Sequence, residues 1–343
     1  MTDITKLVRE NVKALEPYSC ARDEFHGKTG IFLDANENPY GKLNRYPDPY
    51  QGELKKAVSK LRGIAEENIF IGNGSDEIID LCFRVFCNPG TDKALIFSPS
   101  YGMYEVSAAI NDVKTIKVPL NMNFQIDMET LIPFLSDECL KLIFICTPNN
   151  PTGNCIKNTD IESILSHFEG IVILDEAYND FNDQPSFINI IGNYSNLIVI
   201  QTFSKAMGLA AARIGMAFAN EEIISFLNKI KPPYNVSLLN QRAALKRLTS
   251  ISETEDQVKR IRKERERLSF DLQQLGIVIK IYPSDANFLL VKVTDATSIY
   301  NQLVDNRVIV RNRTTIVGNC LRITVGTRYE NSRLVKALKN ITI

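Results

Sequence analysis

Thr202-Phe203-Ser204-Lys205-Ala206-Met207-Gly208-Leu209-Ala210-Ala211-Ala212-Arg213 is the stretch around which the rest of this chain is organised. It follows an apolar run, residues 197–200, that is typical of a buried strand, and it places Lys205 among small residues. Burial of an unpaired ammonium lowers its pKa, and a lysine that loses its proton near neutral pH can attack a carbonyl group. A surface lysine in a strand-to-loop turn is the alternative, so the other segments must decide.

Length and composition describe an ordinary globular chain. At 343 residues it is long enough for a large core and two domains. Its hydrophobic fraction of 44% and charged fraction of 23% are common values. Because 40 Lys and Arg balance 40 Asp and Glu, the chain has no overall basic character, and we expect no nucleic-acid partner.

The cysteines and the N-terminal segment bear on location. Seven cysteines without a Cys-x-x-Cys pair are typical of reduced thiols, and with only two histidines they argue against a metal site. The first ten residues contain no apolar signal core, and no segment reaches the length of a membrane span. We therefore predict a cytoplasmic protein with no metal and no membrane partner.

From Lys93 onward, short apolar runs alternate with helical stretches. The runs that we predict as strands are 94–97, 113–118, 142–146, 171–174, 197–200 and 214–219. Near-continuous apolar strands between helices indicate an α/β fold with a mostly parallel sheet covered on both faces. In such sheets ligands bind outside the carboxyl ends of the strands, so the residues that follow each strand are the informative ones.

The last third of the chain changes character. Pro232-Pro233-Tyr234 interrupts the pattern, a long helix is predicted for 252–275, and shorter strands and helices follow. We predict three parts: an N-terminal arm, residues 1–35, that packs with the small domain; a large domain, residues 36–233; and a small α+β domain, residues 234–343.

The predicted strand ends carry side chains that suit one flat, substituted ring. An ionised Asp175 can hold a ring nitrogen in its protonated form, and Asn150 and Tyr178 can hydrogen-bond a ring hydroxyl. Tyr101 can stack on a ring face, and Lys205 can carry an aldehyde as an imine. Each feature is weak alone, but their order along a parallel sheet indicates one site.

A phosphate site is also indicated. Gly72-Asn73-Gly74-Ser75-Asp76 opens an apolar helix, whose exposed N–H groups and dipole favour an anion; an ordinary helix cap is the alternative. Thr202, Ser204 and Arg213 can join it, because a guanidinium binds phosphate through two parallel hydrogen bonds. Pyridoxal 5'-phosphate, an aldehyde-bearing pyridine that acts as an electron sink, fits all of these groups.

Three stretches resemble hallmarks of the class-II pyridoxal-phosphate aminotransferases of fold type I: residues 202–210, Asn149-Asn150-Pro151-Thr152-Gly153 and Asp175-Glu176-Ala177-Tyr178. Within that family the chain resembles the histidinol-phosphate aminotransferases, at Pro17-Tyr18, Asp34-Ala35-Asn36-Glu37-Asn38-Pro39, Arg45-Tyr46-Pro47-Asp48, Gly74-Ser75-Asp76-Glu77 and Leu321-Arg322-Ile323-Thr324-Val325-Gly326-Thr327. The resemblance covers nearly the whole chain. It implies an aspartate-aminotransferase-like fold, with a large cofactor-binding domain and a smaller α+β domain.

The resemblance also implies a role for each matching residue. Lys205 would form the Schiff base and carry the proton, Asp175 would pair with the ring nitrogen, and Tyr101 would stack on the ring. Asn150 and Tyr178 would contact the ring hydroxyl. The residues around the cofactor phosphate would be Ser75, Asp76, Thr202, Ser204 and Arg213, joined by Tyr46 from the neighbouring subunit of a homodimer with shared active sites.

For the substrate, the resemblance implies a pocket lined by Tyr18, Asn36, Arg311 and Arg322. The reaction would be transamination of L-histidinol phosphate with 2-oxoglutarate in histidine biosynthesis, giving imidazole-acetol phosphate and glutamate. Arg322, helped by Arg311, would bind the substrate phosphate and then the carboxylate of the oxo-acid, which a guanidinium fork allows.

Three alternatives remain on these motifs. One is an aromatic amino-acid aminotransferase, although two arginines at the distal substrate end favour a phosphate over a single carboxylate. Another is a threonine-phosphate decarboxylase, which would release carbon dioxide and need no oxo-acid. The third is a regulatory module that binds the cofactor without turnover; such regulators usually carry a DNA-binding extension, which we do not find in this sequence.

Replacing Lys205 with Ala should abolish both the covalent imine with the cofactor and turnover, because no other group would carry the aldehyde or the proton. The visible spectrum and a steady-state transaminase assay measure the two effects. Steady-state activity retained by the variant would contradict the mechanism.

Overall fold

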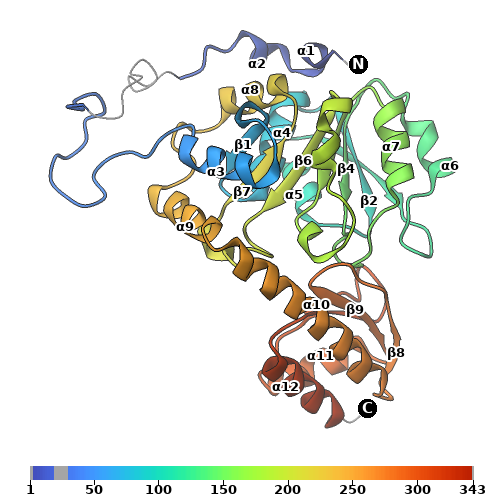
Figure 1. Ribbon diagram of the computed structural model, residues 1–343. Coiled ribbons are helices and arrows are strands. Elements are labelled where there is room, and N and C mark those ends of the chain that lie inside the picture. The colour runs from blue at the N-terminus through green and yellow to red at the C-terminus, as the bar shows by residue number, and fades with distance from the viewer. Residues whose placement is uncertain (1–2, 19–29, 342–343) are drawn as a thin grey trace.

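The computed structural model describes residues 3–18 and 30–341, which form a large and a small sheet, each flanked by helices (Figure 1). The large sheet has seven strands in the order β1-β7-β6-β5-β4-β2-β3. Its strands are β1 (Ile69–Gly72), β2 (Lys93–Ser98), β3 (Lys114–Pro119), β4 (Leu140–Cys146), β5 (Ile171–Asp175), β6 (Leu197–Thr202) and β7 (Gly215–Phe218).

The predicted mostly parallel sheet is confirmed, with one strand reversed. Strands β2 to β6 pair in parallel, whereas β7 lies antiparallel between β1 and β6. A parallel pair needs a long crossover, usually a helix. The chain between β6 and β7 contains only the short 3₁₀ turn η5 (Ala210–Ala212), so it folds straight back beside β6. That return places the end of the lysine stretch next to the strand edge from which it started.

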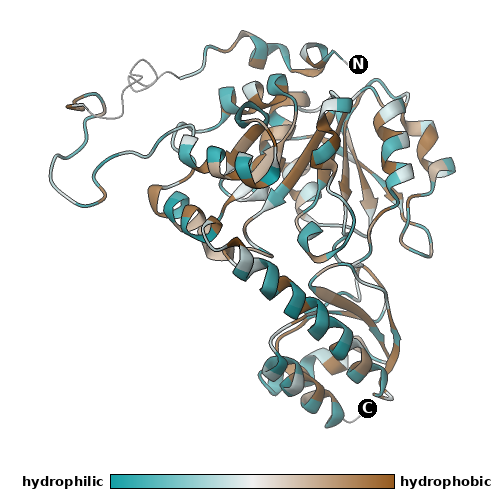
Figure 2. Cartoon of the chain, viewed as in Figure 1, coloured by the Kyte–Doolittle hydropathy of each residue, from teal (hydrophilic) through white to brown (hydrophobic). Residues whose placement is uncertain are grey.

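Alternate residues of the strands enter two different cores, which explains the continuous apolar runs. In β4, Leu142 and Phe144 enter one core, while Ile143 and Ile145 enter the other. The first core is covered by α4 (Ser75–Phe86), α5 (Met103–Ile110) and α8 (Glu221–Ile230), and the second by α3 (Gly52–Arg62), α6 (Met128–Leu131), α7 (Asn158–His167) and α9 (Leu238–Leu248). Figure 2 shows the hydrophobic strands enclosed between these helices.

The small sheet is antiparallel, in the order β10-β11-β9-β8. Its strands are β8 (Val278–Ile281), β9 (Phe288–Val293), β10 (Arg311–Asn312) and β11 (Cys320–Thr324). Its core is closed by α11 (Ala296–Asp305), α12 (Arg328–Lys339) and the last turns of α10 (Ile251–Gln273). The 23-residue α10 links the two parts of the molecule (Figure 1).

The predicted boundary at residue 234 does not match the packing. Val236 and Ala244 are fully buried in a core of the large sheet, so α9 belongs with the large sheet. The small-sheet core takes its first fully buried side chain, Leu268, from the C-terminal half of α10. The chain therefore passes from one packing unit to the other within α10, because one continuous helix contacts both.

The predicted packing of the N-terminal arm with the small domain is wrong for its described part. The arm forms α1 (Ile4–Leu7) and α2 (Glu10–Ala14), which lie beside the large sheet and far from the small one (Figure 1). Ile4, Val8 and Val12, four residues apart, are 1%, 3% and 4% exposed and join the core beneath α4 and α8. The helix is interrupted at Val8 between α1 and α2, yet all three side chains enter the same core, to which α8 contributes.

Two further features concern the whole described chain. In residues 3–18 and 30–341, no helix is both long enough and apolar enough to cross a membrane. The two sheets are joined by a small apolar cluster of Tyr178, Phe181, Ala206, Val258, Ala286 and Phe288. Arg265 in α10 reinforces this junction by donating a 2.7 Å hydrogen bond to the Ala286 carbonyl. Tyr178 of this cluster also lines the candidate site.

Candidate active site

A cavity of about 430 Å³ lies where the carboxyl ends of β4, β5 and β6 face the small sheet. The residues predicted from the sequence that line it are Ser75, Asp76, Tyr101, Asn150, Asp175, Tyr178, Thr202, Ser204, Lys205, Arg213, Arg311 and Arg322. Cys146, Ala177, Ala210 and Arg313 line it as well. The fold thus brings side chains from widely separated segments to one edge of the sheet, as expected for a parallel sheet.

Lys205 lies three residues beyond the end of β6, half-buried in the cavity wall. Its Nζ is 5.4 Å from the centre of the Tyr178 ring. Burial lowers the pKa of Lys205, and the positive charge of Arg322 lowers it further, against the opposing effect of Asp175. A larger share of neutral amine at neutral pH makes this lysine a better nucleophile than a solvated one.

Asp175 is the last residue of the central strand β5 and is 3% exposed. Its Oδ2 accepts a 2.8 Å hydrogen bond from the Tyr104 hydroxyl, and its Oδ1 accepts one of 3.1 Å from the Ala177 amide. Burial raises the pKa of this carboxyl, while these two donors pull it down. Because both donors are neutral, the carboxylate has its charge available for a cationic group in the cavity.

Tyr104 was not among the predicted site residues. It lies on α5, is fully buried, and stacks on Phe144 with ring centroids 4.8 Å apart. The sequence shows it only as one more apolar position of a buried helix. Its closeness in sequence to Tyr101 was the available signal: Tyr101 lies just before α5, and the two rings meet edge to face with centroids 5.5 Å apart.

Asn150 connects the two ends of the cavity. Its Nδ2 donates a 3.4 Å hydrogen bond to the Tyr178 hydroxyl, and its Oδ1 accepts one of 2.5 Å from Nη1 of Arg322. The Arg322 guanidinium also lies 5.4 Å from the centre of the Phe288 ring. A single amide therefore orients a phenol on one side and a guanidinium on the other.

The start of α4 forms the opposite end of the cavity. Asp76 accepts a 3.0 Å hydrogen bond from the Tyr101 hydroxyl and lies 3.2 Å from Nη2 of Arg213. The Ser204 hydroxyl lies 3.5 Å from Nη1 of Arg213 and accepts a 3.0 Å hydrogen bond from Thr202. Hydroxyls, a guanidinium and a helix N-terminus thus surround one small space, which suits a phosphate.

Two glycines allow this close approach. Gly74 has a φ of +80°, and a Cβ there would lie 2.6 Å from Nη2 of Arg213. A Cβ at Gly215 would lie 2.4 Å from the Gly74 carbonyl carbon and 2.5 Å from the Ser75 amide nitrogen. The antiparallel strand β7 therefore lies directly against the start of α4, which only a glycine permits.

Three predicted site residues do not line this cavity. Tyr18 is 71% exposed at the end of the described arm. Asn36 and Tyr46 line a separate hollow, where Tyr46 stacks on Tyr234 with ring centroids 4.4 Å apart. The arm packs on the large sheet and the segment after it extends outward, so neither reaches the cavity of its own chain (Figure 1).

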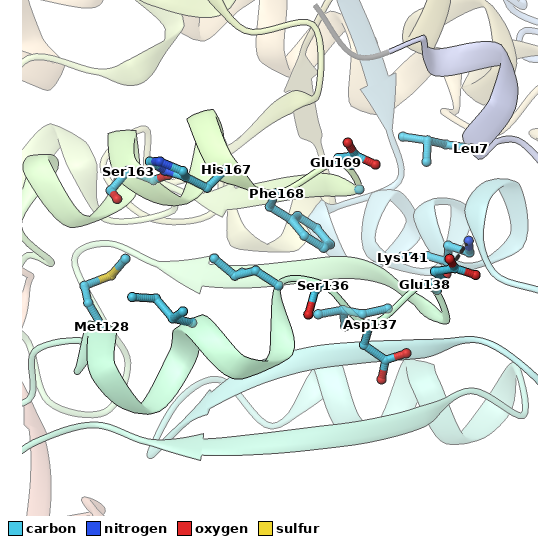
Figure 3. A pocket seen from close by; sticks show the side chains of 14 residues that line it. Leu7, Met128, Ser136, Asp137, Glu138, Lys141, Ser163, His167, Phe168 and Glu169 are labelled. Carbon is cyan, nitrogen blue, oxygen red and sulfur yellow. Dashed lines mark hydrogen bonds between the residues drawn. The ribbon is translucent and has the colours of Figure 1, made fainter.

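A larger hollow, of about 920 Å³, lies at the opposite edge of the sheet, near the starts of β4 and β5 (Figure 3). His167 and Asp137 lie well apart across it. Asp137 is paired with Lys93 at 2.7 Å, and a ring nitrogen of His167 lies 2.8 Å from the Ser163 carbonyl. The hollow is larger than the 430 Å³ cavity but brings no reactive groups together, so we take the smaller cavity as the site.

Known proteins similar to this chain over most of its length are aminotransferases. The family model for aminotransferases of class I and II matches residues 31–338. The histidinol-phosphate aminotransferase of Bacteroides fragilis is 53% identical over 343 residues, covering 99% of each chain, and that of Cytophaga hutchinsonii is 50% identical, covering 98% of each. The chain belongs to the histidinol-phosphate aminotransferase family of class I and II aminotransferases.

The fold of this aminotransferase is shared with solved relatives. The crystal structure of the histidinol-phosphate aminotransferase from Clostridium acetobutylicum superposes with a TM-score of 0.80 at 28% identity, covering 87% of this chain and 90% of that one. The resemblance stated from the sequence motifs and the predicted fold type are therefore confirmed. The roles of individual residues stay predictions.

Gly215→Ala should destabilise the protein by about 1–3 kcal/mol, because the added methyl group would push β7 away from the start of α4. Urea denaturation measures the loss. Gly192→Ala is the matched control, since a Cβ there meets nothing within 4 Å. Equal stability of the two variants would show that the close approach of β7 to α4 carries no cost.

Proposed function

We propose that this aminotransferase transfers the amino group of L-histidinol phosphate to 2-oxoglutarate, giving imidazole-acetol phosphate and glutamate in histidine biosynthesis. The observation that carries the proposal is one cavity with Lys205 and buried Asp175 in its middle and arginines at both ends. The names of close relatives over the whole chain support the substrate assignment.

The cavity fits pyridoxal 5'-phosphate. Asp175, buried and bonded only to neutral donors, suits a protonated ring nitrogen, and the space between the α4 start and Arg213 suits a phosphate. Asn150 and Tyr178 suit the ring hydroxyl, while Tyr101 suits a ring face. When bound, the cofactor stabilises negative charge on the substrate carbon that loses a proton.

Lys205 moves the proton in this proposal. Its lowered pKa keeps a share of the amine neutral, so its Nζ can accept the proton from the substrate carbon and later return it. Asp175 would pair with the ring nitrogen, and at a position only 3% exposed such an ion pair is stronger than in solvent. The phenol of Tyr178, whose pKa is raised by burial, stays protonated and can donate a hydrogen bond.

The distal end of the substrate would bind at Arg322 and Arg311. These residues are directly opposite each other on β11 and β10. Asn150 holds Arg322 in place through the 2.5 Å hydrogen bond. A guanidinium binds phosphate and carboxylate alike, so the same pair can receive L-histidinol phosphate and then 2-oxoglutarate. Tyr18 and Asn36 stay predicted substrate contacts.

We also propose a homodimer with shared active sites, in the cytoplasm. Ile31, Leu33 and Tyr40 are 91%, 89% and 84% exposed on a segment that extends from the body of the chain (Figure 1). Apolar side chains gathered on one exposed segment are typical of a protein–protein interface. Tyr46 follows on the same segment, from which it would reach the cofactor phosphate of the second copy.

The test is a half-reaction. The cofactor-loaded protein is mixed with L-histidinol phosphate without oxo-acid, and the visible spectrum is followed, with L-phenylalanine as the comparison. Fast conversion by L-histidinol phosphate alone supports the proposal. Conversion only by phenylalanine would make the protein an aromatic aminotransferase, and conversion by neither would favour a decarboxylase or a regulator.

Tyr104→Phe should weaken cofactor binding roughly tenfold at pH 6, with a smaller effect at pH 8. The hydrogen bond from Tyr104 lowers the pKa of Asp175, so its loss raises that pKa further above the usual value. A smaller fraction of Asp175 is then ionised, and the deficit is largest at low pH. Spectral titration of the protein with pyridoxal phosphate measures the affinity.

Tyr300→Phe, which removes a phenol hydroxyl from the small-sheet core, is the control for this experiment. It should bind the cofactor as the wild type does at both pH values. A pH-independent loss in Tyr104→Phe would show that the hydroxyl acts through packing and not through the charge of Asp175.

A further inference from the structure

A third arginine lines the distal end of the cavity beside Arg311 and Arg322. Arg313 lies just beyond β10, and its amide donates a 2.8 Å hydrogen bond to the Cys320 carbonyl, so it continues the pairing of β10 with β11. Arg313 belongs to none of the sequence motifs that resemble the family. Its spacing of two from Arg311 is the signal, since alternate residues of a strand share a face.

The register places the three guanidinium groups on one face. Arg311 and Arg322 are direct cross-strand partners. Asn312, between the two β10 arginines, points the other way: its Nδ2 donates a 3.3 Å hydrogen bond to Thr297 at the start of α11. The strand therefore directs Asn312 to the helix layer and leaves Arg311 and Arg313 facing the cavity.

This cluster of Arg311, Arg313 and Arg322 has no balancing acid in the described part of the chain. None of the three forms an ion pair with a carboxylate of residues 3–18 or 30–341. Of the two acids that line the cavity, Asp76 pairs with Arg213, and Asp175 forms no ion pair with any arginine of the cluster. Like charges opposite one another on a sheet destabilise it, so the cluster favours an anion from outside.

Arg313 itself lacks a hydrogen-bond acceptor for one of its buried donors. Its Nε is buried and has no hydrogen-bond partner in the described structure. Burial lowers the pKa of Arg313, and the charges of Arg322 and Arg311 lower it further. A buried donor without an acceptor is costly, and an anionic oxygen is the acceptor that a guanidinium binds most strongly.

We propose that Arg313 is a specificity residue that binds the terminal phosphate of the substrate together with Arg311 and Arg322, and so favours a phosphate over a carboxylate. The inference rests on the proposed function and deepens it. A carboxylate has two oxygens, which Arg311 and Arg322 can satisfy. A phosphate monoester has three terminal oxygens and up to two negative charges, so a third guanidinium adds more to phosphate binding than to carboxylate binding.

The experiment compares cofactor-loaded wild type, Arg313→Gln and Arg313→Lys in the half-reaction with L-histidinol phosphate, L-histidinol and L-glutamate. Arg313→Gln should weaken apparent binding of L-histidinol phosphate roughly tenfold or more, the range for a lost charge-assisted hydrogen bond. L-Histidinol and L-glutamate should change less than about threefold by the same reasoning. Arg313→Lys should fall between, because it keeps the charge but not the fork.

Two further readouts separate specificity from structure. Calorimetry measures the dissociation constant of L-histidinol phosphate in the Lys205→Ala background, where no turnover occurs. Adding Arg313→Gln to that background should raise the dissociation constant by the same factor as in the half-reaction. The ligand-free Arg313→Gln protein should be as thermally stable as the wild type or more so, because one of three like charges is gone. Arg333→Gln, which removes an exposed arginine of α12, is the charge-matched control and should behave as the wild type.

The outcomes are distinguishable. Equal losses for all three substrates, or no loss for L-histidinol phosphate, would overturn the role of Arg313. A lower melting temperature with equal losses would assign it a structural role instead. A wild type that does not convert L-histidinol phosphate would overturn the proposed function itself, whatever the variants do.

Discussion

Burial of the Asp175 carboxylate at the end of the central strand is the constraint on which the site depends. Removing a carboxylate from water is costly, and two neutral donors, Tyr104 and the Ala177 amide, compensate only in part. Asp175 forms no ion pair within the described part of the chain, and the neighbouring strand ends place Asn150, Tyr178 and Lys205 in the same cavity. The hydrophobic layers that bury Asp175 therefore set the pKa of the carboxyl that the proposed function uses.

Charge is divided along the cavity. Asp76 and Arg213 pair at the helix start, Asp175 lies in the middle, and the arginine cluster stands at the small sheet without an acid. Asn150 links the middle to the distal end through Arg322. Because Lys205 lies between these charges, its protonation responds to what binds at both ends, and the pKa of the lysine is lowered by the distal Arg322 itself.

The two sheets contribute different things. The large sheet holds the reactive groups rigidly, since both of its faces are packed and its strands end at one edge. The small sheet brings arginines to that edge through strand register, with Arg311 opposite Arg322. The junction through Phe288 and Tyr178, ring centroids 5.2 Å apart, joins the two parts directly beside the lysine.

Much of this architecture was predictable from local pattern. Continuous apolar runs between helices determine a doubly covered sheet, and the residues after each run, Asn150, Asp175 and Lys205 among them, necessarily meet at its edge. Residues beside a strand end are positioned by the strand itself, so the sequence by itself determined the fold class and most of the cavity lining.

Only the tertiary structure decided the rest. The arm's apolar side chains pack with α8 rather than with the small domain, and α9 packs on the large sheet, because any apolar surface suits such side chains and only the folded chain selects one. Tyr104 and Arg313 likewise became site residues through packing and register. The residues that they contact are distant in sequence, and a local pattern of residue types does not predict contacts between distant segments.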